Sequence, residues 1–502
     1  MLRFPLHRIK AAQRRRDKPR LYELIFMKRI AIIGGGISGL SAAYALEERR
    51  LRGVPVEYVL FEASSRLGGV LVTDRVQGCL VEAGPDSFLT EKPWAIELCK
   101  KLDLGDQLIG SNDRQRKTYI LVKGKLVVMP DGLMFMVPTK ILPTVFSPLF
   151  SLRTKMRMAA EWFHRPHKAS EDETVAELVE RHYGPEMVDR LADPLLSGVY
   201  GGEASQLSVR AVLSRFADME AKHGSLGRAM LSARKKMGAA AKRPLPLFTS
   251  LKEGMQQMAD ALVTRLDARS LRTTSPVGCV TGENSGWTVS AGYQSDHFDA
   301  VIIATPAPAA ASLLRLTHER LASELGGIRY SSSVTVTLGY DETVRRSLPP
   351  GFGFLVPRSE GRRLLAATFV HNKFPHRAPE NRALVRCFLG GARDEQILAS
   401  SEDEILRIVR SELKQIIGIA AEPVFARVYK WRSAMAHYEV GHLERLQRIQ
   451  TLCGSLPGLV LAGNGFTGIG VPDCVRSGTQ AADRLSSVFG LGSADAAQPT
   501  GT

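Results

Sequence analysis

The residues with the clearest chemical potential form a glycine-rich segment, IAIIGGGISG, at positions 30–39. Its first four residues are apolar and predict a buried strand. Gly34, Gly36 and Gly39 follow with G-x-G-x-x-G spacing at the start of a predicted helix. In such a turn the first glycine permits a tight bend, the second lets the backbone approach a pyrophosphate, and the third allows close packing of helix and strand.

The start of this helix and the next strand complete the pattern. The first helical turn, at Ile37 and Ser38, offers unpaired N–H groups to an anion. A second short strand, Tyr58–Phe61, ends directly before Glu62. A carboxylate at this distance accepts hydrogen bonds from ribose hydroxyls and repels a 2′-phosphate. Strand, turn, helix and acidic residue together predict a dinucleotide-binding unit.

A third segment favours FAD over NAD. Arg66, Gly68 and Gly69 form an R-x-G-G sequence shortly after the acidic residue. This extension resembles the signature of FAD-dependent amine oxidases and their relatives. Two glycines let the chain pass close under a flavin, and Arg66 can hold a phosphate with two hydrogen bonds. We therefore expect FAD as the cofactor.

Composition bounds the class of protein. The chain has 502 residues, 44% hydrophobic and 24% charged, which is typical of a globular protein of two or three domains. The net charge of +16 includes +6 from residues 1–26, which hold eight Arg/Lys and two acidic residues. Because Met27 resembles a translation start, we interpret 1–26 as an over-long start assignment or a disordered tail. A transit peptide or a nucleic-acid arm is the alternative. We expect no nucleic-acid partner.

Cysteines, histidines and apolar runs carry further expectations. The six cysteines form no C-x-x-C pair and the histidines show no ligand spacing, so we predict reduced thiols, a cytoplasmic protein and no metal site. The most apolar stretch, Leu133–Leu152, is interrupted by three prolines and Lys140, so it does not predict a spanning helix. Two interpretations stay open: a core segment, or an amphipathic surface that touches a membrane or an apolar substrate.

The pattern along the chain predicts an α/β protein in which a Rossmann-like FAD-binding domain is discontinuous. Segments with nucleotide-domain character come from three separated parts of the chain. An inserted, mainly helical domain and a mixed-sheet substrate domain lie between them. The expected domains are FAD binding (27–95, 250–306 and 440–490), helical and possibly membrane-touching (96–210), substrate binding (211–249 and 307–439), and a disordered tail (491–502).

Motifs spread over most of the chain narrow the family. The sequence resembles the bacterial oxygen-dependent porphyrinogen oxidases, which oxidise coproporphyrinogen III or protoporphyrinogen IX, from about Lys28 to Leu485. The segments that carry this resemblance are GPDSFL (84–89), PLLSGVYGGEASQLS (194–208), GFGFLVP (351–357), FPHRAPE (374–380) and LAGNGFTGIGVPDC (461–474).

The resemblance implies particular FAD contacts. Besides the first glycine turn, Glu62 and the R-x-G-G segment, they fall on Gly84, Val280, Trp431, Gly463, Asn464, Gly470, Val471 and Pro472. Val280 would hold the adenine through backbone hydrogen bonds and Trp431 would wall the flavin. The late glycine loop would lie against the isoalloxazine, with the positive end of the next helix favouring the reduced form.

The resemblance also implies a substrate contact and partners. Lys92 aligns with a lysine proposed to bind a substrate propionate, and a solvated lysine is the alternative. The chemistry would be hydride removal from a methylene bridge in three two-electron rounds, with O2 as acceptor, hydrogen peroxide as by-product and no identified protein base. Hand-over of the product to a ferrochelatase and peripheral membrane contact are further expectations, and the oligomeric state is open. The alternatives are an amine oxidase or carotenoid desaturase of the same fold, or a non-catalytic binding protein of the Rab escort type.

Overall fold

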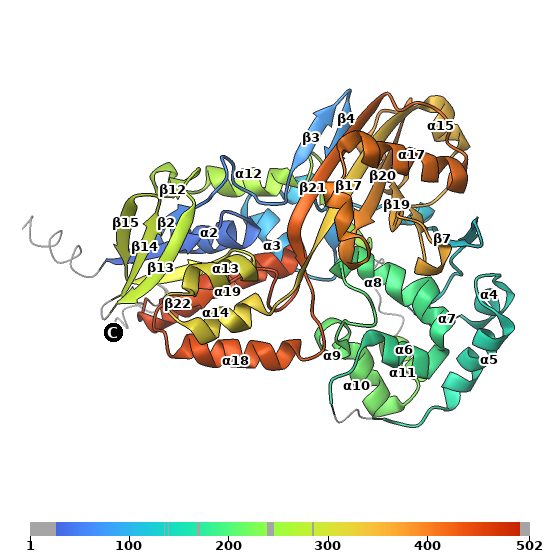
Figure 1. Ribbon diagram of the computed structural model, residues 1–502, viewed down its shortest axis with the longest axis horizontal. Coiled ribbons are helices and arrows are strands. Elements are labelled where there is room, and N and C mark those ends of the chain that lie inside the picture. Colours follow the sequence, from blue (N-terminus) through green and yellow to red (C-terminus); the bar gives the residue numbers. More distant parts are fainter. Residues whose placement is uncertain are drawn as a thin grey trace, which may run out of the picture.

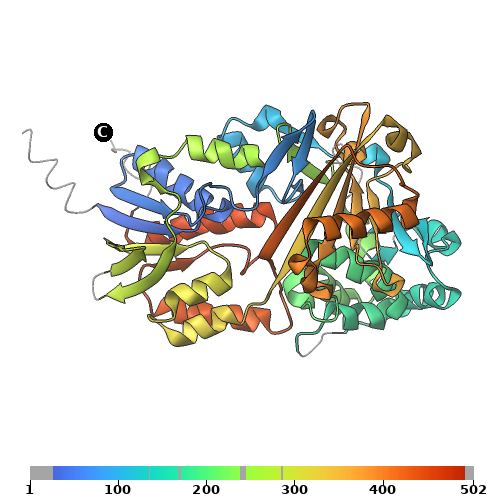
Figure 2. The same ribbon diagram turned by 45° about the horizontal axis from the view of Figure 1, so that its top comes forward.

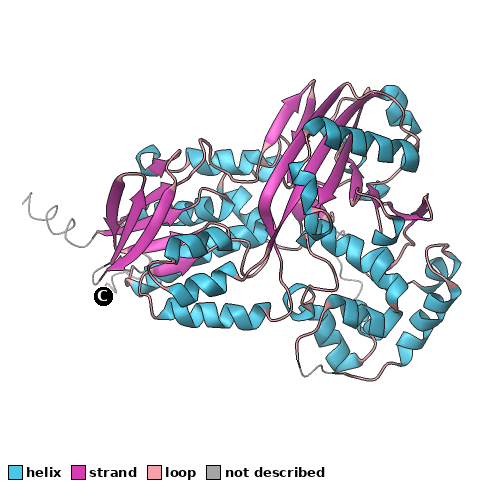
Figure 3. Ribbon diagram, in the orientation of Figure 1, coloured by secondary structure: helices cyan, strands magenta, loops and turns pink. Residues whose placement is uncertain are grey.

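The structure is a computed structural model that describes residues 27–491, apart from 135, 139, 168–170, 238–244 and 284–285. The expectations for residues 1–26 and for the C-terminal tail beyond Leu491 therefore lie outside the described residues. Three parts can be distinguished in Figure 1: a nucleotide-binding part on the left, a sheet part at the upper right and a helical part at the lower right. Figure 3 shows that strands gather in the first two parts.

A five-stranded parallel sheet forms the centre of the nucleotide-binding part. Its strands, in spatial order, are β12 (Leu271–Arg272), β2 (Val56–Phe61), β1 (Lys28–Ile33), β16 (Ala300–Ile303) and β22 (Leu459–Leu461). Parallel strands covered on both faces read as continuous apolar runs, and residues 30–33 and 300–303 are all buried. The sheet thus unites three separated parts of the chain, which confirms the predicted discontinuous fold.

Helices cover one face of this sheet, and a second, smaller sheet and further helices cover the other. The first layer holds α2 (Ile37–Leu51), α3 (Trp94–Lys101), α12 (Gln256–Thr264) and α19 (Val471–Val488). The second layer holds β13 (Val277–Glu283), β14 (Gly286–Ala291), β15 (Gln294–Phe298), α13 (Ala307–Leu314), α14 (Glu319–Gly326) and α18 (His442–Gly454). Residues 307–326 therefore pack with the nucleotide-binding part rather than with the substrate domain expected for them, because their apolar side chains join the same buried cluster as Val301 and Ile303 of β16.

The sheet part is built on seven strands. In spatial order they are β21 (Phe425–Ala436), β17 (Tyr330–Asp341), β20 (Arg382–Gly390), β19 (Ala366–Phe369), β18 (Gly353–Leu355), β7 (Thr118–Val122) and β8 (Lys125–Val128). Apolar residues of α17 (Glu402–Ile417) bury against one face. Figure 2 shows the long strands β17 and β21 (yellow-orange and brown-orange) running from the nucleotide-binding part into this sheet.

Smaller elements join these parts. A hairpin of β3 (Thr73–Val76) and β4 (Cys79–Glu82) stands beside the large sheet, and α15 (Glu342–Ser347) and α16 (Val370–Lys373) follow strands of that sheet. A separate three-stranded sheet contains β5 (Phe88–Leu89), β11 (Phe248–Leu251) and β6 (Leu108–Gly110).

The helical part has its own core. Its helices are α4 (Ile141–Phe146), α5 (Leu152–Ala160), α6 (Val175–Tyr183), α7 (Pro185–Met187), α8 (Asp193–Tyr200), α9 (Val209–Val212), α10 (Ser214–His223) and α11 (Leu226–Met237). A short hairpin, β9 (Leu133–Met134) and β10 (Val137–Pro138), precedes them. The extent differs from the expected 96–210. β7 and β8 leave for the large sheet, where β7 pairs with β18, while α10 and α11 continue the helical layer to Met237.

A buried histidine joins helices of this part. The two ring nitrogens of His182 on α6 lie 3.2 Å from a carboxylate oxygen of Glu161 and 3.0 Å from one of Glu220. Although burial opposes the charge, the bonds to these carboxylates raise the pKa of His182. The histidine and its two carboxylates therefore form an ion-paired staple between α10 and the segment after α5.

The apolar stretch 133–152 contributes both to this core and to its surface. Leu133, Leu149 and Phe150 are buried, whereas Leu142 and Phe146 on α4 are 69% and 80% exposed. Within the part of the chain that the structure describes, no helix has the length and apolar character needed to cross a bilayer.

Candidate functional site

The first glycine turn is closed by backbone contacts and open where a ligand would approach. A Cβ atom added at Gly39 would lie 1.9 Å from the carbonyl oxygen of Gly34, and Gly34 itself has φ +106°, which other residues rarely adopt. At Gly36 an added Cβ would meet no protein atom within 4 Å. Gly36 is also the N-cap of α2, and no side chain caps it. The turn therefore offers free N–H groups at Ile37 and Ser38 beside open space, as a pyrophosphate requires.

Glu62 lies at the end of β2 and contacts the same turn. One carboxylate oxygen accepts a hydrogen bond from the Gly35 N–H at 2.7 Å, and the other accepts from the N–H and the hydroxyl of Ser64, both at 2.8 Å. The side chain is half-buried, and a carboxylate has about four acceptor positions. Glu62 can therefore bind a ribose hydroxyl while it keeps the glycine turn in place.

The R-x-G-G segment packs against the first turn, but its arginine has local partners. Gly69 lies next to Gly36, since a Cβ on Gly69 would be 3.1 Å from the Gly36 Cα, and Gly68 packs on α12. The Arg66 guanidinium donates to the carbonyl oxygens of Leu67, at 2.8 Å, and of Gly69. The glycines thus lie in close contact with the first turn and with α12, and their approach to a flavin stays a prediction. For Arg66 the observed role is to shape its own loop, and a phosphate contact stays a prediction.

Gly84 joins this chain of backbone contacts from a third segment. A Cβ on Gly84 would lie 2.0 Å from the carbonyl oxygen of Val70, the residue after Gly69. Trp431 on β21 reaches the same place, because its indole N–H donates to the carbonyl of Ala83 at 2.9 Å. The first turn, the R-x-G-G segment, the segment before Pro85 and Trp431 are therefore brought together, as expected for one cofactor site.

The late glycine loop is held by two tyrosines that the sequence did not point to. The hydroxyl of Tyr330 donates to the Asn464 side-chain oxygen at 3.0 Å, and that of Tyr438 donates to the Asn464 carbonyl at 2.8 Å. The Tyr438 oxygen also accepts from the Gly468 N–H at 2.7 Å. Gly463 donates its N–H to Ser477 on α19 at 3.0 Å. No spacing in the sequence connects these residues, so only the fold reveals them.

This loop leads into α19, whose start resembles that of α2. Gly470 is the N-cap without a side-chain cap, and Val471 and Pro472 form the first turn. α19 packs directly on α2, since a Cβ on Gly478 would lie 2.0 Å from the Ser38 carbonyl oxygen. Two packed helices therefore each present an uncapped N-terminus, which favours negative charge.

The remaining two predicted residues are partly engaged. Val280 is fully buried on β13, and its carbonyl accepts a hydrogen bond from the Thr317 hydroxyl, so a contact with adenine stays a prediction. Lys92 donates to the carboxylate of Asp473 at 2.5 Å, and its side chain is 34% exposed. Asp473 lies in the first turn of α19, so Lys92 is close to the late glycine loop and remains accessible from one side.

The tyrosines and the histidine around the late loop stay neutral near pH 7. Burial, with a smaller effect of Asp473, raises the pKa of Tyr200 to about 12, and burial also raises the pKa values of Tyr330 and Tyr438. Burial lowers the pKa of His442, whose ring stacks on Tyr438 at 4.2 Å between ring centroids. These groups can donate hydrogen bonds, but the tyrosines do not supply a ready base.

Comparison with known proteins agrees with this geometry. Residues 37–486 match the family model described as flavin containing amine oxidoreductase. Coproporphyrinogen III oxidase of Bacillus subtilis is 34% identical over 92% of this chain and 99% of its own length. Protoporphyrinogen oxidase 2 of Arabidopsis thaliana is 29% identical over 93% of this chain and 95% of its own.

Solved structures show the same fold. A proposed protoporphyrinogen oxidase from Exiguobacterium sp. 255-15 superposes with a TM-score of 0.82 at 29% identity, covering 92% of this chain and 99% of that one. Cyclohexylamine oxidase from Brevibacterium oxydans, at 19% identity and a TM-score of 0.65, shares the fold alone. The match to the family model over most of the chain establishes that the chain belongs to the flavin containing amine oxidoreductases, a family of FAD-dependent enzymes.

Proposed function

We propose that the protein is an FAD-dependent oxidase of a porphyrinogen, either coproporphyrinogen III or protoporphyrinogen IX, in haem biosynthesis. The observation that carries this proposal is the similarity over nearly the full length of both chains to coproporphyrinogen III oxidase of Bacillus subtilis. The more distant amine oxidase, at 19% identity, supports the fold but not an amine substrate.

The roles of the chain's own residues follow from the site. FAD supplies the electron-accepting chemistry when it is bound. Glu62 and the first turn would bind its adenosine and pyrophosphate, Gly69 and Gly84 would allow close approach to the ring system, and the N-terminus of α19 would favour negative charge there. Because the tyrosines nearby are neutral, we infer that they position the loop rather than remove a proton.

Lys92 is the proposed contact for a substrate propionate. Its ammonium group already pairs with Asp473, so it is held at a defined place, and the exposed third of the side chain leaves donors for a second carboxylate. A carboxylate bound there would share the lysine with Asp473. The alternative, a lysine that only anchors the start of α19, predicts no effect on substrate affinity.

Two measurements test the proposed activity. The purified protein should carry FAD absorbance, and aerobic incubation with each porphyrinogen should yield the fluorescent porphyrin with consumption of O2 and formation of hydrogen peroxide. Comparing kcat/KM for the tetra-acid and the di-acid decides between the two substrates. Flavin-loaded protein that oxidises neither porphyrinogen, but oxidises amines or desaturates a carotenoid, would refute the proposal in favour of another activity of the same fold.

We also propose a cytoplasmic location with peripheral contact to an anionic membrane through α4 and α5. Large apolar side chains are exposed there together with exposed basic residues, a combination typical of interfacial binding. The apolar set is Leu142, Val145, Phe146, Leu152 and Met156, and the exposed basic set includes Lys140 and Arg153.

Vesicle sedimentation tests this surface. The protein should sediment with vesicles containing phosphatidylglycerol more than with pure phosphatidylcholine, and Phe146→Glu should abolish the difference. Val424→Glu is the control, because Val424 is an exposed apolar residue on the sheet part. Equal binding of all variants, or none by the wild type, would contradict the contact. Hand-over of the porphyrin to a ferrochelatase stays a further proposal, testable by porphyrin transfer between the purified proteins.

A further inference from the structure

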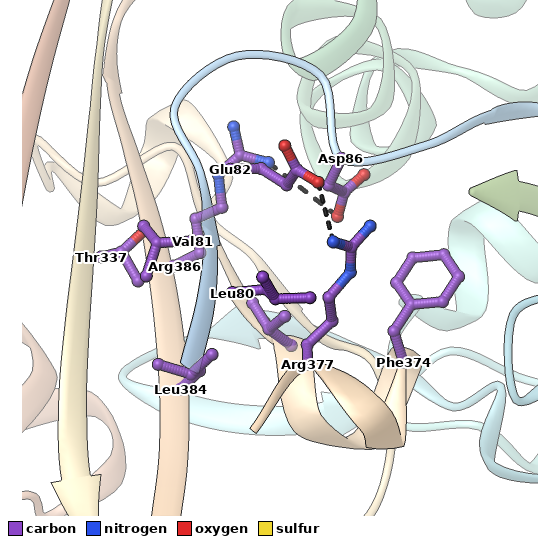
Figure 4. A pocket seen from close by; sticks show the side chains of 10 residues that line it. Leu80, Val81, Glu82, Asp86, Thr337, Phe374, Arg377, Leu384 and Arg386 are labelled. Carbon is purple, nitrogen blue, oxygen red and sulfur yellow. Dashed lines mark ion pairs between the residues drawn. The ribbon is translucent and has the colours of Figure 1, made fainter. Parts of the chain in front are cut away.

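Five charged side chains meet beneath the cofactor segments. Four of them, Glu82, Asp86, Arg377 and Arg386, line a small internal cavity (Figure 4), and the fifth, Lys373, pairs with Asp86. Glu82 ends β4 and Asp86 follows it, while Lys373, Arg377 and Arg386 come from α16, the turn after it, and β20. We call this set the ionic cluster. Each of the five side chains is at most 15% exposed. The cluster thus joins the nucleotide-binding part to the sheet part at a place from which bulk water is largely excluded.

The pairing within the cluster leaves an excess positive charge. Arg377 lies 2.9 Å from a Glu82 oxygen, Lys373 donates to both oxygens of Asp86 at 3.0 Å, and an Arg386 nitrogen lies 3.9 Å from Asp86. Burial would raise the pKa of Asp86, but Lys373 and Arg386 hold that pKa below its usual value, so the carboxylate stays ionised. Burial raises the pKa of Glu82 and lowers that of Arg386, but an arginine stays protonated in proteins, so three cations face at most two anions. A net charge buried in this way is costly unless a further interaction offsets it.

Arg386 connects the cluster directly to the cofactor segments. The Arg386 guanidinium donates to the carbonyl oxygen of Gly84 and lies 3.5 Å from the carbonyl oxygen of Ala83. The Ala83 carbonyl oxygen also accepts a hydrogen bond from the Trp431 indole. Gly84 packs against Val70. Because Val70 follows Gly69, and Gly69 lies against the first glycine turn, a displacement of Arg386 would be passed on to the R-x-G-G segment and to the first glycine turn.

We propose that Arg386, supported by Lys373 and Asp86, is a positioning residue for the Ala83–Gly84 segment and that the net positive charge of the ionic cluster raises the midpoint potential of bound FAD. This inference rests on the proposed cofactor site. Reduction adds negative charge to the cofactor, and a positive charge fixed behind a backbone segment that contacts it favours the reduced form. The excess cation, costly in the protein alone, is thereby offset when FAD is reduced.

Opposite charge changes give the test. Arg386→Gln removes one positive charge and should lower the midpoint potential, whereas Asp86→Asn removes one negative charge and should raise it. We expect a change of about tenfold in the equilibrium between oxidised and reduced protein for each variant, or about 30 mV for a two-electron couple. Arg386→Lys keeps the charge and should keep most of the potential. The potential is measured by reduction with a reference dye, and FAD affinity and Tm are measured in parallel.

A second arginine serves as a matched control. Arg393 is buried to a similar degree and pairs with Asp193, but it contacts Val356 and Asp193 rather than the cofactor segments. Arg393→Gln should therefore lower Tm. It should change the equilibrium between oxidised and reduced protein by less than about twofold, so the midpoint potential stays close to that of the wild type. Lys373→Gln also removes one positive charge. If the Arg386 variant does not accumulate, Lys373→Gln gives the sign of the shift in midpoint potential for loss of a cation.

The outcomes distinguish a failure of the proposed role of the ionic cluster from a failure of the proposed cofactor site. Shifts of opposite sign for the cation and anion variants support the inference. Shifts of the same sign, or none, in flavin-loaded variants would overturn it and reduce the cluster to a structural ion network, while the cofactor site would stand. A wild-type protein that binds no FAD would remove the cofactor site itself.

Discussion

The replacement Glu62→Ala is the most direct test of the cofactor site. The structure shows that Glu62 uses three of about four acceptor positions on the Gly35 and Ser64 groups, so the nucleotide has to share this carboxylate. A ribose hydrogen bond to the remaining position of this charged acceptor contributes about 1.5–3 kcal/mol. Its loss should weaken FAD binding by about 10- to 100-fold, since about 1.4 kcal/mol corresponds to tenfold. Because Gly35 is buried, its N–H left without an acceptor costs a further amount of about 1–3 kcal/mol, which lowers the stability of the glycine turn.

The assay is a fluorescence titration of the apoprotein with FAD. Two control variants divide the contributions. Glu57→Ala removes a carboxylate from an exposed position on the same strand and should leave the affinity unchanged. Ser64→Ala removes one loop hydrogen bond without removing the ribose acceptor and should cost at most a few-fold. If Glu62→Ala binds FAD with wild-type affinity, the assignment of Glu62 to the ribose is incorrect. If Ser64→Ala is as weak as Glu62→Ala, the effect arises from loop order.

Three further outcomes are expected. Deleting residues 1–26 should leave flavin content, activity and Tm nearly unchanged, because this segment has no apolar periodicity; a large loss of activity would show that it is functional. Lys92→Ala should raise KM more than it lowers kcat, and the loss in kcat/KM should correspond to about 1–3 kcal/mol. The loss should be larger for the tetra-acid than for the di-acid. Lys92→Arg should recover part of this loss, and an unaltered KM for both substrates would exclude the propionate contact. The raised pKa of His182 means that its ion pairs with Glu161 and Glu220 stabilise the fold below the unfolded-state pKa of about 6.5, and that this contribution disappears as the pH rises through the folded-state value. Tm should therefore fall on this alkaline limb in the wild type and less in His182→Gln, and parallel pH profiles of the two proteins would contradict the role of the staple.

Local patterns in the sequence were sufficient for the nucleotide-binding elements. Residues 30–33 and 58–61 form strands because continuous apolar runs suit a parallel sheet covered on both faces. The glycine spacing after the first strand predicted the turn, because the conformation at Gly34 and the contact between Gly34 and Gly39 depend on residues close in the chain. The apolar residues of the helix Glu402–Ile417 recur with helical spacing, so this element too is determined by its local sequence.

Domain boundaries were harder to predict. β7 and β8 lie within a mainly helical stretch, yet they extend a sheet whose other strands begin some 200 residues later. A strand that pairs with distant partners has no local sign of which sheet it joins. Residues 307–326, expected in the substrate domain, form helices whose buried partners also come from distant segments, so no local pattern assigns them to the nucleotide-binding part.

The sequence by itself determined the family, the cofactor and the residues of each glycine turn, because these depend on spacing within short segments. Only the tertiary structure decided what holds those segments together. Arg386 binds the Gly84 carbonyl, Tyr438 binds Asn464, and Lys92 pairs with Asp473. Lys92 and Asp473 are 381 positions apart in the chain, so neither periodicity nor spacing can relate them. Such pairs form because burial makes an unpaired charge or polar group costly, and that condition exists only once the chain has folded.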